Sequence, residues 1–204
     1  MTSDAPFRII FVVAFVSVVL VTLYHRIRSW ASKEKLDRRQ EGLLILLTLR
    51  PLGLTLWLAV IAYMVDPSLM AWASTPIPTW ARCLGVGLYV LTLALLIWTL
   101  RSLGTNLTDT VVTRKNHTLV THGPYRFIRH PFYVSVGLFI LAVALIAANW
   151  FFVLMGGIVL SLLVLRIGVE EAHLLARFGS AYARYRERTG RFLPRWPRDQ
   201  RALK

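Results

Sequence analysis

The chain has 204 residues, a formal net charge of +14 at pH 7 and a positive mean hydropathy of +0.56. Hydrophobic residues make up 56% of it and charged residues only 17%, whereas a soluble domain has about 45–50% and about 25%. This hydrophobic content excludes a disordered chain, and the long apolar runs exclude a soluble nucleic-acid-binding protein. A single cysteine excludes an internal disulfide framework. Apolar runs separated by basic segments are typical of an integral membrane protein.

Five apolar runs are long enough, or nearly so, to cross about 30 Å of hydrocarbon as a helix of about 20 residues. They are Phe7–Tyr24, Gly42–Val65, Trp80–Leu100, Phe132–Ala148 and Trp150–Gly168. Only Asn149 separates the last two runs, which predicts a tight helical hairpin. The predicted fold class is an all-α integral membrane protein of about five transmembrane helices, followed by an amphipathic C-terminal helix.

The basic residues indicate how these helices are oriented. Segments 25–41, 101–131 and 166–204 hold 21 of the 24 lysines and arginines, while segment 66–79 and the hairpin tip hold none. By the positive-inside rule the basic side is cytoplasmic, which places the N-terminus outside and the C-terminus in the cytoplasm. Arg50 interrupts the second run, and both a snorkelling side chain and a functional intramembrane arginine stay open for it.

The second cytoplasmic segment, residues 101–131, leads into a run that could carry chemistry, His117–Tyr133. Gly123-Pro124 is a turn signal, and Pro131 suits the first turn of the fourth helix. This places His130 at a helix N-terminus near the membrane surface, where free backbone donors favour an anionic group. A basic juxtamembrane loop without chemistry explains the composition equally well.

An acidic pair, Glu170-Glu171, follows the last apolar run on the same side. Carboxylates at the end of a membrane helix are costly unless they are paired or functional. Arg166 lies one helical turn before Glu170 and offers it a structural partner, so we expect Glu171 to be the functional member. Apolar positions of an amphipathic helix follow at Leu174, Phe178, Tyr182 and Tyr185. The histidines on this side lack ligand spacing and a cysteine partner, so no metal site is expected.

Together these segments resemble a known family. The run His117–Tyr133, followed by Glu170–Leu174 and Phe178–Tyr185, is similar to the isoprenylcysteine carboxyl methyltransferase family, and phospholipid N-methyltransferases share much of the pattern. The apolar runs predict a three-span membrane region over residues 1–100, and the resemblance implies a catalytic region over residues 101–204. It also implies an S-adenosyl-L-methionine site formed by the cytoplasmic ends of the last helices and the C-terminal segment.

The resemblance further implies which residues form that site. Near the reacting groups it places Glu170, Glu171, Arg188 and Arg191. As cofactor-binding residues it implies His117, Leu119, Val120, Thr121, Gly123, Pro124, Tyr125, Arg129, His130, Pro131 and Tyr133. The expected acceptor is a lipid-tailed or prenylated molecule, with membrane lipids and no nucleic acid as further partners. The ending Arg188–Pro194 departs from the Val-Pro run of eukaryotic members, which favours a bacterial or archaeal cytoplasmic membrane over the endoplasmic reticulum.

Three other functions stay open from the sequence. A phospholipid amine N-methyltransferase would need a general base, and a glutamate could serve. Sterol-type membrane reductases carry a similar Arg-His-Pro-x-Tyr element and use NADPH. A non-catalytic membrane protein that binds anionic lipid would need only the basic segments.

Overall fold

The computed structural model describes residues 4–30, 43–104 and 118–195, and these residues form helices with no β-strand among them. Five long helices form a bundle: α1 (Ala5–Trp30), α2 (Leu43–Val65), α3 (Thr79–Leu103), α4 (Pro131–Ala147) and α5 (Trp150–Leu165). Within these described residues, four stretches are long and apolar enough to cross a membrane, namely α1, α2, α3 and α5 continued into α6 (Ile167–Phe178). Helix α4 is apolar but has only 17 residues. All five predicted helices are therefore present, and the all-α membrane fold is confirmed.

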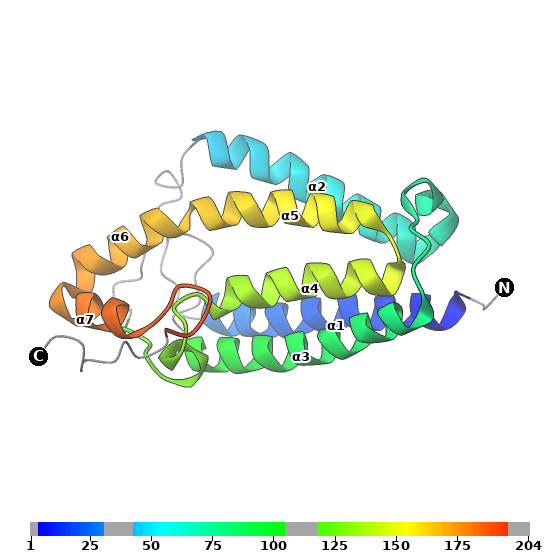
Figure 1. Cartoon of the computed structure of the whole chain (residues 1–204). Coiled ribbons are helices and arrows are strands. Elements are labelled where there is room, and N and C mark those ends of the chain that lie inside the picture. The colour runs from blue at the N-terminus through cyan, green and yellow to red at the C-terminus, as the bar shows by residue number, and fades with distance from the viewer. Residues whose placement is uncertain (1–3, 31–42, 105–117, 196–204) are drawn as a thin grey trace, which may run out of the picture.

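Helix α4 lies between the other helices of the bundle and packs against α1, α3 and α5, while α2 packs against α5 (Figure 1). Three buried aromatic rings join α1, α2 and α5: the Phe11 centroid lies 4.6 Å from that of Tyr63 and 5.4 Å from that of Phe152. On the outside of the bundle, large apolar side chains are exposed; Leu54 is 60% exposed and Leu91 is 58% exposed. Apolar surface of this extent suits contact with lipid. Because α4 packs on α1 and α3, the two predicted regions share one core.

The turn between α4 and α5 confirms the predicted hairpin. Ala148 adopts a left-handed conformation with φ of 50°, which ends α4. The Asn149 side chain then accepts a hydrogen bond from the Phe151 N–H at 3.1 Å and so caps the first turn of α5. Its amide nitrogen also donates to the Met70 carbonyl at 3.1 Å, in the short helix η2 (Pro67–Ala73). One residue thus closes the hairpin and fastens it to the α2–α3 connection.

Two arginines at this end of the bundle complete helix termini. Arg8 donates to the Met64 carbonyl at 2.8 and 3.2 Å, where α2 ends. Arg82 donates to the Ile146 carbonyl at 3.0 Å, where α4 ends, and pairs with Asp4. Helix C-termini leave carbonyl groups without partners and carry partial negative charge, so both contacts are favourable. Two of the three basic residues outside the basic segments therefore have structural partners.

The predicted amphipathic segment is present, but it divides into α6 and α7 (Ser180–Arg188) at Gly179. Gly179 has φ of +52°, which favours glycine, and its N–H donates to the Leu175 carbonyl at 2.8 Å. The bend turns α7 back toward the end of the bundle (Figure 1). Tyr182 of α7 is consequently 1% exposed and packs inside the protein instead of facing lipid.

Candidate active site

The loop before α4 rests on the end of α3 through Gly123. It contains the single-turn helix η4 (Gly123–Arg126), and Gly123 begins this turn with φ of +62°. A Cβ at this position would lie 2.1 Å from the Ser102 hydroxyl oxygen of α3. Only glycine satisfies both the backbone conformation and the close approach. The Gly-Pro turn read from the sequence therefore fixes where the loop lies.

A C-terminal segment, residues 189–195, runs beside the end of this loop. Ile128 and Gly190 form a parallel bridge, and the backbone N–H of Arg129 donates to the Gly190 carbonyl at 2.8 Å. The His130 N–H donates to the Arg191 carbonyl at 3.1 Å. A Cβ at Gly190 would lie 1.7 Å from the Leu193 carbonyl oxygen, so the tight turn here requires glycine. These bonds bring two segments about 60 residues apart in sequence to the N-terminus of α4.

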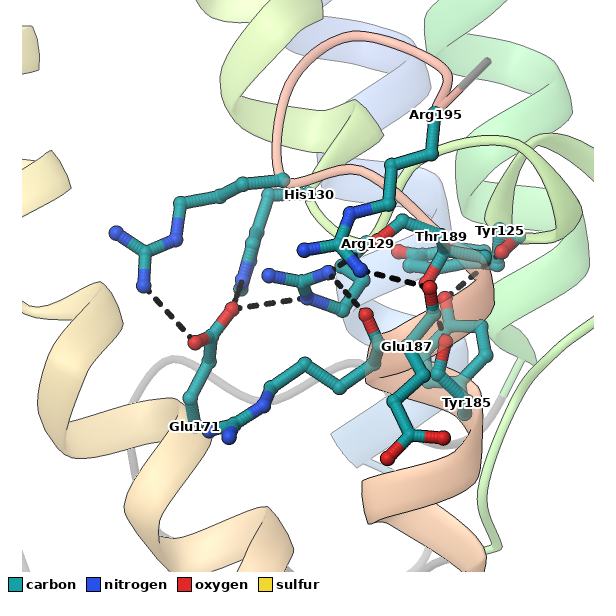
Figure 2. A network of polar contacts seen from close by, with 10 residues as sticks. Tyr125, Arg129, His130, Glu171, Tyr185, Glu187, Thr189 and Arg195 are labelled. Carbon is teal, nitrogen blue, oxygen red and sulfur yellow. Dashed lines mark hydrogen bonds and ion pairs between the residues drawn. The ribbon is translucent and has the colours of Figure 1, made fainter. Parts of the chain in front are cut away.

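Glu171 of α6 binds both segments through its carboxylate. Its Oε1 accepts from Arg129 Nε at 3.0 Å and from His130 Nε2 at 3.1 Å, and its Oε2 accepts from Arg191 Nη2 at 3.0 Å. Figure 2 shows the carboxylate facing Arg129 and His130. The Glu171 side chain is 8% exposed and that of Arg129 is also 8% exposed. A buried carboxylate requires such partners, and here it has three.

Arg129 has further hydrogen bonds, and the surroundings of His130 determine its protonation. Arg129 Nη1 donates to the Arg186 carbonyl at 3.1 Å and to the Thr189 carbonyl, so its guanidinium also holds the end of α7 (Figure 2). Burial lowers the pKa of His130, while the nearby Glu170 and Glu171 oppose this shift. A neutral His130 that bonds to a carboxylate must carry its proton on Nε2, because the carboxylate can only accept.

Glu170 faces a different partner from Glu171. Its Oε2 accepts from the Tyr133 hydroxyl of α4 at 3.2 Å. The Tyr133 ring lies 5.6 Å from the His130 ring, centroid to centroid. The acidic pair therefore contacts α4 at two neighbouring positions, with Glu171 buried in the ionic network and Glu170 only half-buried.

The structure brings six of the fifteen predicted site residues together. Arg129, His130, Glu171 and Arg191 form one network, with Glu170 and Tyr133 beside it. The remaining described residues of the expected cofactor site lie in η4, just before it, or in the first turn of α4: Leu119, Val120, Thr121, Gly123, Pro124, Tyr125 and Pro131. Arg188 is exposed at the end of α7 and makes no hydrogen bond to the network within the described ranges. His117 lies outside the described residues. The roles of all these residues in catalysis and cofactor binding stay predictions.

Sequence reasoning missed the tyrosines of α7, which it assigned to an apolar face. The Tyr185 hydroxyl donates to the Tyr125 carbonyl at 2.7 Å and so ties α7 to η4 (Figure 2). Tyr182 lies fully buried beside it, with ring centroids 6.0 Å apart. The signal available in the sequence was a pair of tyrosines directly after a glycine that can bend the helix. Among the described residues, no three His, Cys, Asp or Glu side chains gather as a metal site would need.

Comparison with known proteins identifies the family. The sequence pattern of the phospholipid methyltransferase family matches residues 80–181, which is half of the chain. The chain belongs to this family. The matched range includes α3, the loop before α4, the hairpin and α6, and it therefore includes Arg129, His130 and Glu171.

Individual relatives confirm the resemblance read from the sequence. Protein-S-isoprenylcysteine O-methyltransferase of Schizosaccharomyces pombe is 36% identical over 84 residues, covering 41% of this chain and 36% of that protein. The protein of the same name from Tribolium castaneum is 34% identical over 104 residues, covering 45% of this chain and 34% of that protein. The chain thus spans about a third of the length of these curated relatives.

A solved structure shares the fold of this phospholipid methyltransferase family member. It is the eukaryotic intramembrane Ras methyltransferase ICMT (isoprenylcysteine carboxyl methyltransferase), with a TM-score of 0.57 over 91% of this chain and 67% of that chain. The sequence identity is 21%, so this likeness shows the arrangement of helices.

Proposed function

We propose that the protein is an S-adenosyl-L-methionine-dependent membrane methyltransferase that acts on the carboxylate of a lipid-tailed acceptor of the isoprenylcysteine type. The observation that carries the proposal is the network on Glu171, which holds two guanidinium groups and a histidine at one end of an apolar bundle. The family and the names of the curated relatives support the same class of reaction.

The residues around Glu170 and Glu171 fit a sulfonium cofactor. When bound, S-adenosyl-L-methionine supplies a methyl group on a positively charged sulfur, which needs little activation. Glu170 offers negative charge, and the rings of His130 and Tyr133 offer aromatic surface; both attract a cation. Arg129, held by Glu171 and by the end of α7, keeps these elements in one position. The protein's contribution is then mainly to hold donor and acceptor in line, which is a positioning effect.

Arg191 is the proposed binding group for the acceptor carboxylate. Its side chain is 49% exposed, and within the described part of the chain its only hydrogen bond goes from Nη2 to Glu171. The remaining N–H groups of the guanidinium can bind a carboxylate with two bonds. A carboxylate needs no general base to attack a methyl group, so no residue has to remove a proton. Glu171 would orient Arg191, and Glu170 would be the base only if the acceptor were an amine.

The position of the network suits an acceptor with a lipid tail. Exposed apolar side chains cover the bundle, and the network lies at the end where α6, α7 and η4 meet (Figure 1). We propose that this end faces the cytoplasm, and the support is the concentration of basic residues on its side. The departure at residues 188–194 supports a bacterial or archaeal membrane, although both curated relatives come from eukaryotes.

The chemistry of the product tests the proposal. Purified protein is incubated with S-adenosylmethionine carrying a tritiated methyl group, in separate reactions with N-acetyl-S-farnesylcysteine and with extracted membrane phospholipid. We expect label in farnesylcysteine that alkali releases as volatile methanol, because methyl esters hydrolyse in base. Arg191→Gln should raise the KM for farnesylcysteine, whereas the matched variant Arg184→Gln, which changes an exposed arginine of α7, should leave it unchanged.

Other outcomes would identify a different function. Alkali-stable label in phospholipid would indicate amine N-methylation and overturn the carboxylate acceptor. Transfer to no acceptor, together with stabilisation by NADPH but not by S-adenosylmethionine, would overturn the methyltransferase proposal as a whole.

A further inference from the structure

The hydroxyl of Tyr182 is buried without a partner. Tyr182 lies in α7 and is 1% exposed, and its Oη forms no hydrogen bond within residues 4–30, 43–104 and 118–195. Buried tyrosine hydroxyls usually have a partner, and one left without costs about 1–3 kcal/mol. Nothing in the proposed reaction described above uses this group.

The neighbouring tyrosine provides a direct contrast. Tyr185, three residues further along α7, donates its hydroxyl to the Tyr125 carbonyl at 2.7 Å. Its structural role, to hold α7 against η4, is therefore complete without a ligand. Tyr182 has a ring of the same size in the same helix but an unsatisfied hydroxyl. Packing inside the protein accounts for a buried aromatic ring at Tyr182, but it does not account for a buried hydroxyl without a partner.

Charged groups of the network act electrostatically on this hydroxyl. Burial raises the pKa of Tyr182, the negative charges of Glu171 and Glu170 raise it further, and Arg129 opposes them. The hydroxyl therefore stays protonated, with one hydrogen to donate and lone pairs that can accept. A buried hydroxyl without a partner, influenced by both carboxylates and a guanidinium, suits a ligand that carries both signs of charge.

These observations distinguish between the two substrates of the proposed reaction. The prenyl tail of the acceptor has no polar atom that could satisfy a hydroxyl. The acceptor carboxylate is assigned to Arg191, whose side chain is 49% exposed, whereas Tyr182 is buried. The amino-acid end of S-adenosylmethionine carries an ammonium and a carboxylate, and both can bond to a hydroxyl.

We propose that the Tyr182 hydroxyl binds the amino-acid end of S-adenosylmethionine, an inference that rests on the proposed function. Tyr182 is then a binding residue for the methyl donor and takes no part in acceptor recognition. The inference also explains why a tyrosine, and not a phenylalanine, occupies a buried position in α7.

Three ligands and two matched variants test this role. Tyr182→Phe and Tyr185→Phe each remove one hydroxyl from α7. Equilibrium binding is measured for S-adenosylmethionine, for S-adenosylhomocysteine, and for methylthioadenosine, which lacks the amino-acid end. We expect Tyr182→Phe to weaken the first two about tenfold, which corresponds to about 1.4 kcal/mol, and to leave methylthioadenosine unchanged. The KM for the farnesylcysteine acceptor should not change.

Thermal unfolding without ligand provides an independent measurement. Tyr182→Phe should unfold at the wild-type temperature or above it, because it removes an unsatisfied polar group. Tyr185→Phe should unfold at a lower temperature, because it breaks the bond to Tyr125. Lower unliganded stability of Tyr182→Phe would mean that its hydroxyl bonds within the protein, and this would overturn the inference.

The binding results separate failure of the inference from failure of the proposed function. Wild-type affinity of Tyr182→Phe for S-adenosylhomocysteine, or an equal loss for methylthioadenosine, would overturn the role of Tyr182 while the cofactor assignment stands. Failure of the wild-type protein to bind either S-adenosyl ligand would overturn the proposed function and this inference with it.

Discussion

Replacing Glu171 with glutamine keeps the size of the side chain and removes its negative charge. The carboxylate accepts from Arg129 and Arg191 at 3.0 Å and from His130 at 3.1 Å. A glutamine has one oxygen that can accept, and its NH₂ group would face a second donor. At least one bond to a charged donor is therefore lost, and such bonds contribute about 1.5–3 kcal/mol each.

The burial of the two arginines decides how large the loss is. Arg191 is 49% exposed, so water can replace its lost partner. Arg129 is 8% exposed and keeps its bonds to the carbonyls of Arg186 and Thr189, so it is only partly left without partners. We expect Glu171→Gln to lower the free energy of unfolding by about 2–3 kcal/mol, or about 4–12 °C in Tm.

Activity and stability are measured together, in detergent, for Glu171→Gln and for the matched variant Glu170→Gln. Glu170 accepts one bond, from Tyr133 at 3.2 Å, so its variant should be less affected. Turnover on farnesylcysteine should fall at least tenfold for Glu171→Gln, which is about 1.4 kcal/mol in the barrier. If Glu171→Gln kept the turnover and the Tm of the wild type, the network would not be the site. A greater loss of turnover for Glu170→Gln than for Glu171→Gln would lead to the same conclusion.

Three further predictions concern orientation, the loop and pH. In a chain without its native cysteine, a cysteine at Ser74 should react with an impermeant reagent added outside intact cells, and a cysteine at Ser180 should not. The reverse result would contradict the predicted orientation. Gly123→Ala should lower Tm more than Gly179→Ala, since both have positive φ but only Gly123 has a Cβ position 2.1 Å from another side chain; equal losses would contradict the close approach. Because burial lowers the pKa of His130 below its ordinary 6.5, its stabilising effect is present above about pH 6.5 and is lost as pH falls. Tm should therefore fall more steeply from pH 7 to pH 5 in the wild type than in His130→Gln, and parallel curves would contradict this assignment.

The helices and the hairpin could be predicted because their signals are local. Hydropathy depends on runs of about 20 residues, and an α4–α5 turn at Asn149 follows from a single polar residue between two such runs. The choice of Glu171 over Glu170 as the functional member stays a prediction: Glu171 lies in the ionic network, whereas Glu170 bonds to Tyr133. It came from a local spacing argument about Arg166.

The pairing that builds the site has no local signal. Residues 128–130 meet residues 189–191 through backbone bonds, and backbone groups are the same in every residue. The bend at Gly179 was also missed, since a glycine inside a helical pattern is often tolerated. As a result Tyr182 and Tyr185 are predicted as apolar positions of one amphipathic helix, whereas the bend carries both toward the protein.

The two ends of the bundle solve opposite electrostatic problems with the same residue type. At the hairpin end, Arg8 and Arg82 bond to helix carbonyls, so their charge is compensated by helix termini. At the other end, Arg129 and Arg191 both meet the carboxylate of Glu171, so two positive charges share one negative charge and an anionic ligand can approach the exposed part of Arg191. At the hairpin end, the charges of Arg8 and Arg82 are paired with groups of the protein. At the α6–α7 end, about half of the Arg191 side chain is exposed and can bind a ligand. That difference, and not the number of arginines, is the reason to locate the chemistry where the C-terminal segment meets α4.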